Sequence, residues 1–233
     1  MSLPSPVAAI VLDIEGTTSS LSYVRDRLFP FSRDRIDAFL AGSSEQVAGL
    51  VAEVRELAGQ PAASIAEVAA ILRGWIDTDV KAPPLKSIQG LIWAEGFADG
   101  SLLAPVYDDV PPALAAWTAA GIAVHSYSSG SVGAQREWYR HTQHGDLLGY
   151  FGSLFDTRQP GPKREPSSYL MISRTLGVPP GSLLFASDEP GELVAASQAG
   201  WQAVGVRRPG DPGGQSGEHN WISDFDSYRP SKA

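Results

Sequence analysis

Short, continuous apolar runs are the clearest recurring feature of this chain. The first spans residues 7–12 and is followed directly by a polar string at residues 13–20. A short apolar run that ends in a polar turn is typical of a buried strand in a parallel sheet. The run therefore predicts a strand at residues 7–12, and further strands are predicted at residues 122–127, 153–156, 183–186 and 203–206.

A helical pattern fills the stretch between the first two predicted strands. Ser43-x-x-Gln46 and Ser64-x-x-Glu67 have the form of capping boxes, and each precedes apolar residues at helical spacing. A further amphipathic stretch carries apolar side chains from Leu85 to Phe97. Residues from about 20 to 100 are therefore expected to be almost wholly helical.

Strand and helix alternate again after about residue 104. Helices are predicted at residues 111–120, through Trp138, at 167–176 before Gly177, and between the last two strands. This order predicts an α/β fold with a Rossmann-like doubly wound parallel sheet. We expect residues 1–19 and 105–233 to form the core domain and residues 20–104 to form an inserted helical cap domain. The tail from Pro209 is rich in Gly and Pro and is expected to loop over the surface.

The charge and residue composition of the chain argue against some kinds of partner and cofactor. The chain has 233 residues, a formal net charge of −8 and a sequence pI of about 5.0. An acidic balance argues against nucleic acid as the main partner, because phosphate backbones select basic faces. It does not exclude a small phosphorylated ligand, since magnesium and a locally positive pocket can supply charge. The chain has no cysteine, and its four histidines show no HExxH spacing, which argues against a zinc hydrolase.

Membrane and export signals are not apparent in the sequence. No apolar run approaches the ~20 residues that span a bilayer. The first residues lack the charged start of a signal peptide, and residues 7–12 are too short for its apolar region. We therefore expect a cytoplasmic location and no membrane partner.

Three predicted strands end in polar clusters: residues 13–18, 128–131 and 187–189. If these strands are parallel neighbours, the clusters converge at one edge of the sheet. Lys163 lies in an irregular loop that is able to bring an ammonium group to the same place. Such a gathering of carboxylates, hydroxyls and a lysine favours phosphoryl transfer with magnesium.

Each group has a candidate role in that chemistry. Asp13 is the candidate nucleophile toward phosphorus, and Glu15 is a second acid that holds the metal, shuttles the leaving-group proton, or does both. Ser128 or Ser129 would bind phosphoryl oxygens, and Lys163 would offset their charge. Asp188, with or without Glu189, would complete an all-oxygen magnesium site.

Each residue taken alone also has a purely structural explanation. Asp13 is equally well a turn residue, Lys163 a solvated surface lysine, and the Ser128 stretch or Asp188-Glu189 a helix cap. For Asp108-Asp109, which precede a predicted helix, we favour the capping explanation. The conjunction of all the clusters at successive strand ends favours the catalytic hypothesis.

At these motifs the sequence resembles the haloacid-dehalogenase superfamily, whose phosphatases carry Asp-x-Asp-Gly-Thr. Here the string is Asp13-Ile14-Glu15-Gly16-Thr17-Thr18, which is similar to the enolase-phosphatases of methionine salvage. Further segments share that resemblance: Leu85–Gly96 in the cap, Val106–Pro111, Tyr127–Gln135, His141–Leu147 and Phe155–Thr157. The resemblance extends to about Pro209. The prolines around Lys163 and the Ser187–Gly191 stretch depart from the family pattern.

The resemblance implies a role for each matching position. Asp13 would be nucleophile and magnesium ligand, Glu15 a metal ligand and acid/base, and Asp188 the third protein contribution to Mg²⁺. Ser128, Ser129 and Lys163 would bind the phosphoryl group. The family enolises a small phosphorylated diketone, 2,3-diketo-5-methylthiopentyl-1-phosphate, and then hydrolyses its phosphate to give 1,2-dihydroxy-3-keto-5-methylthiopentene. It is often monomeric.

The cap is expected to hold the methylthio end of the substrate. Trp93 and Phe97 are candidates to line such a pocket, although for Phe97 a place in the cap core is the favoured interpretation. The base for enolisation is left open between Glu15 and a cap residue.

Two other functions fit parts of the pattern. One is a phosphatase of the same superfamily that acts on another sugar phosphate or nucleotide, since only the cap would differ. The other is a non-catalytic protein that binds a phosphorylated ligand, against which the intact Asp13, Lys163 and Asp188 argue. A P-loop kinase or GTPase fits poorly, because no GxxxxGK[ST] follows the first strand.

Overall fold

Two compact units make up the chain. The computed structural model describes residues 6–42, 44–211, 219–226 and 228. One unit comprises Met1–Leu21 and Leu103–Ala233, and the other comprises Ser22–Leu102. We call the first the α/β unit and the second the helical unit.

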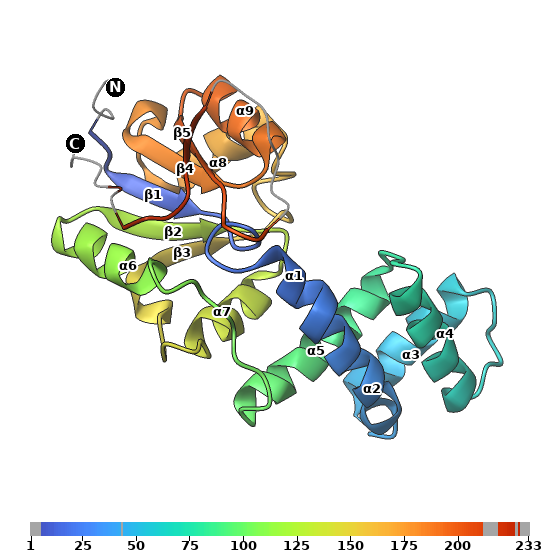
Figure 1. The fold of residues 1–233 in the computed structure, drawn as a ribbon. Coiled ribbons are helices and arrows are strands. Elements are labelled where there is room, and N and C mark those ends of the chain that lie inside the picture. Colours follow the sequence, from blue (N-terminus) through green and yellow to red (C-terminus); the bar gives the residue numbers. More distant parts are fainter. Residues whose placement is uncertain (1–5, 43, 212–218, 227, 229–233) are drawn as a thin grey trace. The chain divides into compact units, whose positions relative to one another are not determined.

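A parallel six-stranded sheet forms the centre of the α/β unit (Figure 1). Its order is β3-β2-β1-β4-β5-β6, and every neighbouring pair is parallel. The strand order reverses at β1, where crossovers to both sides begin, so the prediction of a doubly wound sheet is confirmed. The strands are β1 Ala9–Leu12, β2 Ala123–Tyr127, β3 Phe151–Phe155, β4 Leu183–Ser187, β5 Gln202–Val206 and β6 Asn220–Ile222.

Alternate residues of the strands face two separate apolar layers. Ile10 and Leu12 pack in one layer with helix α6 (Val110–Ala119), whose Trp117 is 2% exposed. Ala9 and Val11 pack in the other layer with helices α8 (Pro166–Leu176) and α9 (Pro190–Gln198). Helix α7 (Val132–Arg140) packs beside β3. Both faces are covered, which explains why β1, at the centre of the sheet, is continuously apolar.

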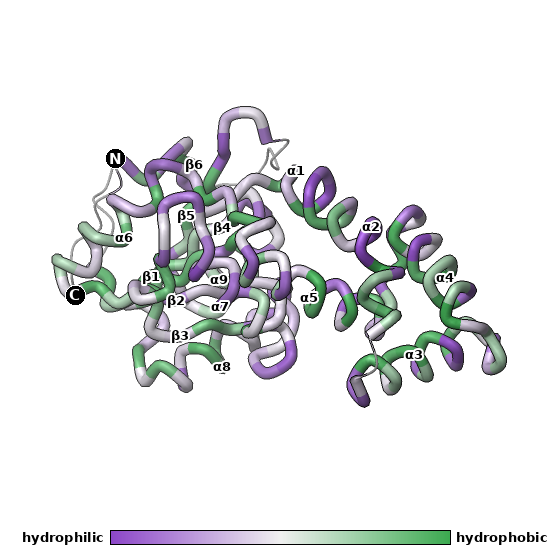
Figure 2. Tube along the Cα trace, turned by 90° about the horizontal axis from the view of Figure 1, so that it is seen from below, coloured by the Kyte–Doolittle hydropathy of each residue, from purple (hydrophilic) through white to green (hydrophobic). Residues whose placement is uncertain are grey.

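The helical unit is built from helices throughout, as the sequence predicts. After α1 (Leu21–Tyr23) and a π-helical segment (Val24–Leu28) come α2 (Phe29–Leu40), α3 (Glu45–Leu57), α4 (Ile65–Asp77) and α5 (Pro83–Ala98). Figure 2 shows hydrophobic positions recurring along these helices between hydrophilic ones. Phe97 is 4% exposed and belongs to the core of this unit, in agreement with the favoured interpretation.

The two predicted capping boxes have different outcomes. Ser64 accepts from the N–H of Glu67, and the Glu67 carboxylate accepts from the N–H of Ser64, so this box is confirmed. The other prediction is wrong by one residue. Ser44 is the N-cap of α3 and accepts from the N–H of Val47, whereas Ser43 lies outside the described residues. Adjacent serines offer the same side chain, so spacing alone does not choose between them.

The predicted surface loop after Pro209 is also partly wrong. Residues 220–222 form β6, which pairs with β5 through Val204, Gly205 and Val206. Gly205 leaves room for the Trp221 ring, which a Cβ at that position would overlap. A three-residue strand among Gly and Pro carries too little pattern to be recognised from the sequence. No helix among the described residues is both long enough and apolar enough to cross a membrane.

Acid sensitivity is expected from His125, on β2. This histidine is 7% exposed, its Nδ1 has no hydrogen-bond partner, and burial lowers its pKa from 6.5 to about 4. The unfolded chain therefore binds a proton that the folded chain does not, and stability falls as pH falls from 6.5 to 4, by up to about 3 kcal/mol. Denaturant unfolding at several pH values should show that a His125→Leu variant loses less unfolding free energy between pH 6.5 and 4 than the wild type does. Parallel profiles for variant and wild type would contradict the assignment.

Candidate active site

The carboxyl ends of three adjacent strands bring the predicted clusters together. β1 pairs with β2 and β4 so that Leu12 lies opposite Ser126 on one side and Ala186 on the other. The strands therefore end level with one another, and the polar residues that follow them lie at one edge of the sheet. This edge, at the point where the strand order reverses, is where ligands bind in open parallel sheets.

Asp13 begins a tight turn and is 5% exposed. Its Oδ1 accepts from the N–H of Ile14 at 2.8 Å and lies 2.6 Å from Nζ of Lys163. Its Oδ2 lies 3.4 Å from the hydroxyl oxygen of Ser187. The carboxylate is thus oriented by the second residue of the turn and by a charged partner from a distant loop, beside a hydroxyl at the end of a strand.

Gly16 makes the turn possible and sets its distance from Asp188. Its φ is +70°, a conformation that favours glycine. A Cβ at this position would overlap the carboxyl group of Asp188. The turn that carries Asp13 and the strand end that carries Asp188 are therefore in contact, as the sequence led us to expect.

Lys163 reaches the same place from the proline-rich loop. It is 8% exposed, and its Nζ lies 2.7 Å from Oε2 of Glu192 in addition to its pair with Asp13. Side chains of the core bind the loop backbone: Tyr127 donates to the carbonyl of Gly161 at 2.6 Å and Tyr169 to that of Lys163 at 2.7 Å. The prolines that depart from the family pattern therefore do not remove Lys163 from the site.

Glu192 is a member of this cluster that the sequence analysis missed. It lies on the first turn of α9, and its Oε2 accepts from the Ser187 hydroxyl at 2.9 Å as well as binding Lys163. Glu192 follows Asp188 at the i, i+4 spacing of one helical turn, and this spacing was the signal that could have identified it. An acid in a helix is common on protein surfaces, so the spacing alone did not single it out.

The cluster holds more negative than positive charge. Three acids, Asp13, Asp188 and Glu192, meet one lysine. Burial, followed by the charges of Asp13 and Glu192, raises the pKa of Asp188 to about 7. Burial and Asp13 raise the pKa of Glu192 to about 7 as well, although Lys163 opposes them. Burial alone would lower the pKa of Lys163, but Asp13 and Glu192 outweigh it and raise that pKa.

A divalent cation fits this excess of buried carboxylate charge. The donors are all oxygens, which magnesium prefers. Among the described residues, no group of three or more His, Cys, Asp or Glu side chains has the arrangement of a metal cage. Magnesium rarely uses such a cage and is commonly bound by one or two carboxylates, waters and substrate phosphate. Asp13 and Asp188 are two carboxylates that would hold it here, and Glu15 stays the third predicted ligand.

The predicted phosphate-binding serines differ in exposure. Ser128 is 4% exposed, and its Oγ accepts from the N–H of Gly130 at 3.2 Å, whereas Ser129 is exposed. Gln135 of α7 donates to the carbonyls of Gly130 and Phe155, both at 2.8 Å, and so fixes the loop. Glu15 is half-buried, and its backbone pairs with that of Ser19. The roles of these side chains stay predictions.

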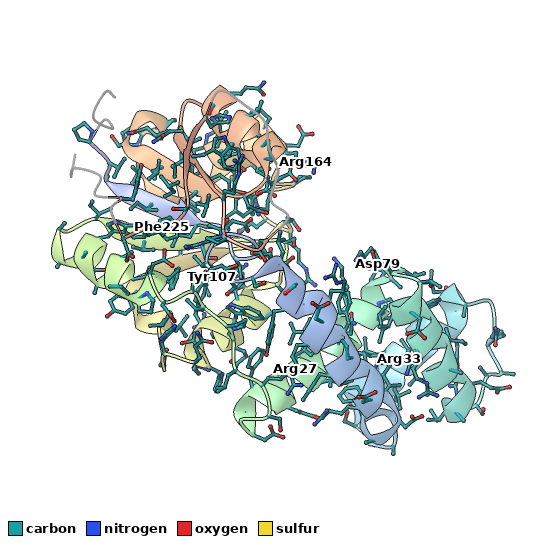
Figure 3. All side chains as sticks on the ribbon, viewed as in Figure 1. Arg27, Arg33, Asp79, Tyr107, Arg164 and Phe225 are labelled. Carbon is teal, nitrogen blue, oxygen red and sulfur yellow. The ribbon has the colours of Figure 1, made fainter. Side chains whose placement is uncertain are left out.

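Two acids near the site make structural contacts. Glu189 accepts from the N–H of Gly191 at 3.1 Å and pairs with Arg164, labelled in Figure 3, so it caps α9, which is the structural explanation given for Asp188-Glu189. A part in holding the metal stays a prediction for Glu189. Asp109 makes no side-chain cap to α6, and the capping prediction for it is wrong. It binds Arg208 instead, which lies 99 residues further along the chain.

Trp93 belongs to the helical unit. Its indole N–H donates to the carbonyl of Leu28 at 2.9 Å, and its ring stacks on Phe29 at a centroid distance of 6.3 Å. Its side chain is half-buried. Contact with substrate stays a prediction for this residue.

Comparison with known proteins gives both fold and family. A search of protein-family models found no match. The chain is 53% identical to Enolase-phosphatase E1 of Streptomyces avermitilis, over 91% of this chain and 90% of that relative. The crystal structure of UTR4 protein from Saccharomyces cerevisiae superposes with a TM-score of 0.81 at 29% identity, covering 95% of this chain and 99% of that one.

A more distant structure shares the fold alone. L-2-haloacid dehalogenase from Xanthobacter autotrophicus superposes with a TM-score of 0.53 at 19% identity, covering 86% of this chain and 77% of that one. The α/β unit therefore has the haloacid-dehalogenase fold. On the identity to its relatives over nearly the whole length, this chain belongs to the enolase-phosphatase E1 family.

Proposed function

We propose that this protein is an enolase-phosphatase, or acireductone synthase, of methionine salvage. Its substrate would be 2,3-diketo-5-methylthiopentyl-1-phosphate and its product 1,2-dihydroxy-3-keto-5-methylthiopentene. The observation that carries the proposal is the buried pair of Asp13 and Lys163, 2.6 Å apart, at the strand edge of a chain in this family. The helical unit would act as the cap domain predicted at residues 20–104.

Phosphate transfer would begin with attack by Asp13. A bond forms between a carboxylate oxygen of Asp13 and phosphorus, and the bond from phosphorus to the substrate oxygen breaks. Glu15 is the candidate to give that oxygen its proton. Water then attacks the aspartyl-phosphate, which releases phosphate and regenerates Asp13.

Lys163 would serve both stages of this transfer. Its ammonium group lies between Asp13 and Glu192, at 2.6 and 2.7 Å. The phosphoryl group would bring further negative charge beside these carboxylates. A buried ammonium offsets that charge more strongly than an exposed one, because less water screens it.

Enolisation requires removal of a proton next to a carbonyl group. Glu15 and a residue of the helical unit are the candidates for that base. Bound Mg²⁺ would act as a Lewis acid that stabilises the developing enolate and neutralises phosphate. The hydroxyl of Ser128, and that of Ser129, would donate to phosphoryl oxygens.

A substrate panel tests the proposal against the rival phosphatase. The diketo-phosphate, several sugar phosphates and a nucleotide would be compared by phosphate release in the presence of Mg²⁺. We expect kcat/KM for the diketo-phosphate to exceed kcat/KM for each other substrate by at least about a hundredfold. Contacts dedicated to one substrate give discrimination of that size. Equal or better turnover of a sugar phosphate would favour the rival. Failure to turn over any of them would favour a non-catalytic protein.

Removal of magnesium is expected to stop turnover. Excess chelator should reduce phosphate release below about 1% of the original rate, and added Mg²⁺ should restore it. Binding can be measured without turnover, because a cation that binds only the folded state raises its thermal midpoint. This rise should be lost in Asp188→Asn and kept in Glu189→Gln, a matched acid that caps α9. Undiminished activity in chelator, or an equal rise in both variants, would reject the metal site.

A monomeric state and a cytoplasmic location stay predictions of the sequence.

A further inference from the structure

We propose that Arg208 is a positioning residue that holds the catalytic turn, residues 13–19, in the shape that aims Asp13 at phosphorus. The inference rests on the proposed function, because it concerns the turn that carries the nucleophile. Arg208 lies two residues beyond the end of β5 and is 3% exposed. A guanidinium group stays charged, so a buried one needs paired partners and is placed by them.

Two segments distant in sequence fix the guanidinium group. Its Nη1 donates to both carboxylate oxygens of Asp109, at 2.9 and 2.8 Å, and Asp109 also accepts from the N–H of Phe225 at 2.7 Å. The rings of Tyr107 and Phe225, both labelled in Figure 3, lie with their centroids 4.4 and 4.9 Å from its central carbon. Contacts to a carboxylate and two aromatic rings leave the group little freedom to move.

Another nitrogen of the guanidinium group binds the catalytic turn, while Nη2 is buried without a hydrogen-bond partner among the described residues. Nε of Arg208 donates to the carbonyl of Thr17 at 2.7 Å. Within the turn, the carbonyl of Ile14 accepts from the N–H groups of Thr17, Thr18 and Ser19, at 3.2, 2.9 and 2.9 Å. The carbonyl of Thr17 takes no part in these hydrogen bonds. Its bond from the charged Arg208 fixes the plane of the peptide that joins Thr17 to Thr18. A rigid group of the core thereby determines the orientation of the turn.

The turn transmits this restraint to the reacting groups. Asp13 is its first residue, and Gly16 within it contacts the carboxyl group of Asp188. A displacement of the turn would therefore move both the nucleophile and its acidic neighbour. A misplacement of about 1 Å can lower a rate by about a hundredfold without removing any reacting group. In this arrangement Asp109, which lies in the Val106–Pro111 motif, holds Arg208 in place.

The first test separates orientation from folding. Arg208→Met is compared with Arg207→Met, in which the neighbouring exposed arginine, packed over Trp221, is changed in the same way. The rate is measured well below the thermal midpoint and divided by the folded fraction. For Arg208→Met we expect kcat to fall by about 30- to 100-fold with KM within about twofold of wild type. Arg207→Met should leave both unchanged.

Milder variants cover the case in which Arg208→Met does not fold. Arg208→Lys keeps the charge but has one donor nitrogen in place of three, and Asp109→Asn keeps the shape of the anchor. Each should lower kcat by about 3- to 10-fold without raising KM. A kcat per folded molecule within twofold of wild type in these variants would overturn the proposal.

A second readout does not depend on activity. Hydrogen exchange of the amides in residues 14–20 should accelerate at least about tenfold in the Arg208 variants, and not in Arg207→Met. Unchanged exchange in this segment would overturn the proposal even if activity fell. If the wild-type protein released no phosphate at all, the proposed function would fail, and the exchange rates alone would decide whether Arg208 holds the turn.

Discussion

Replacing Asp13 by asparagine is expected to abolish phosphate release while leaving the fold intact. Asparagine has the same shape but no nucleophilic carboxylate, so we expect turnover to fall at least about a thousandfold. The fold should survive, because the change removes one negative charge from a cluster in which three acids meet one lysine. The measurement is phosphate release with Mg²⁺, together with a thermal unfolding scan of the same sample.

A matched change elsewhere serves as the control. Asp108→Asn alters an exposed aspartate of the same unit, whose side chain is 92% exposed. It should retain wild-type turnover and stability. Phosphate release at the wild-type rate in Asp13→Asn would reject Asp13 as the nucleophile. Loss of activity together with loss of folded structure would reject the expectation that the fold survives.

Replacing Lys163 by methionine is expected to damage both stability and turnover. The change leaves Asp13 and Glu192 buried without their positive partner, and removal of one member of a buried ion pair typically costs about 3–5 kcal/mol. Turnover per folded molecule should fall at least about a hundredfold, because the ammonium group no longer offsets the charge of the phosphoryl group. Denaturant unfolding and phosphate release measure the two effects.

A second substitution distinguishes loss of the ion pair from loss of packing. Adding Glu192→Gln removes one of the two buried carboxylates that Lys163→Met leaves without a positive partner. The double variant should therefore be more stable than Lys163→Met alone. Turnover should not recover, since the ammonium group is still absent. Lys86→Met, at an exposed position of α5, should change neither quantity by much. A double variant no more stable than Lys163→Met would contradict the electrostatic account.

The sheet could be predicted because its signal is local and strong. Each strand of the site is a short apolar run followed by polar residues, as at residues 7–12 before Asp13. Buried parallel strands require such runs, and the chain order of strands and helices then restricts the topology. The adjacency of β1, β2 and β4 was a condition of the predicted site, and the structure meets it.

Contacts between distant segments could not be predicted in the same way. Asp109 looked like a helix cap because it precedes α6, yet its carboxylate binds Arg208 beyond the end of β5. No periodicity in the sequence links two such positions. Glu192 likewise has the appearance of an ordinary helix residue until α9 brings it to Lys163. Tertiary contacts override local preference at these places, and they lie beside the proposed reacting groups.

A single-turnover reaction with the diketo-phosphate and Mg²⁺ tests the proposed enolisation and phosphate transfer together. Enol absorbance and free phosphate would be followed in the same sample. We expect an enol to form first and one phosphate per substrate molecule to appear afterwards, with no phosphate released by Asp13→Asn. Release of phosphate without an enol, or an unreacted substrate, would contradict this expectation.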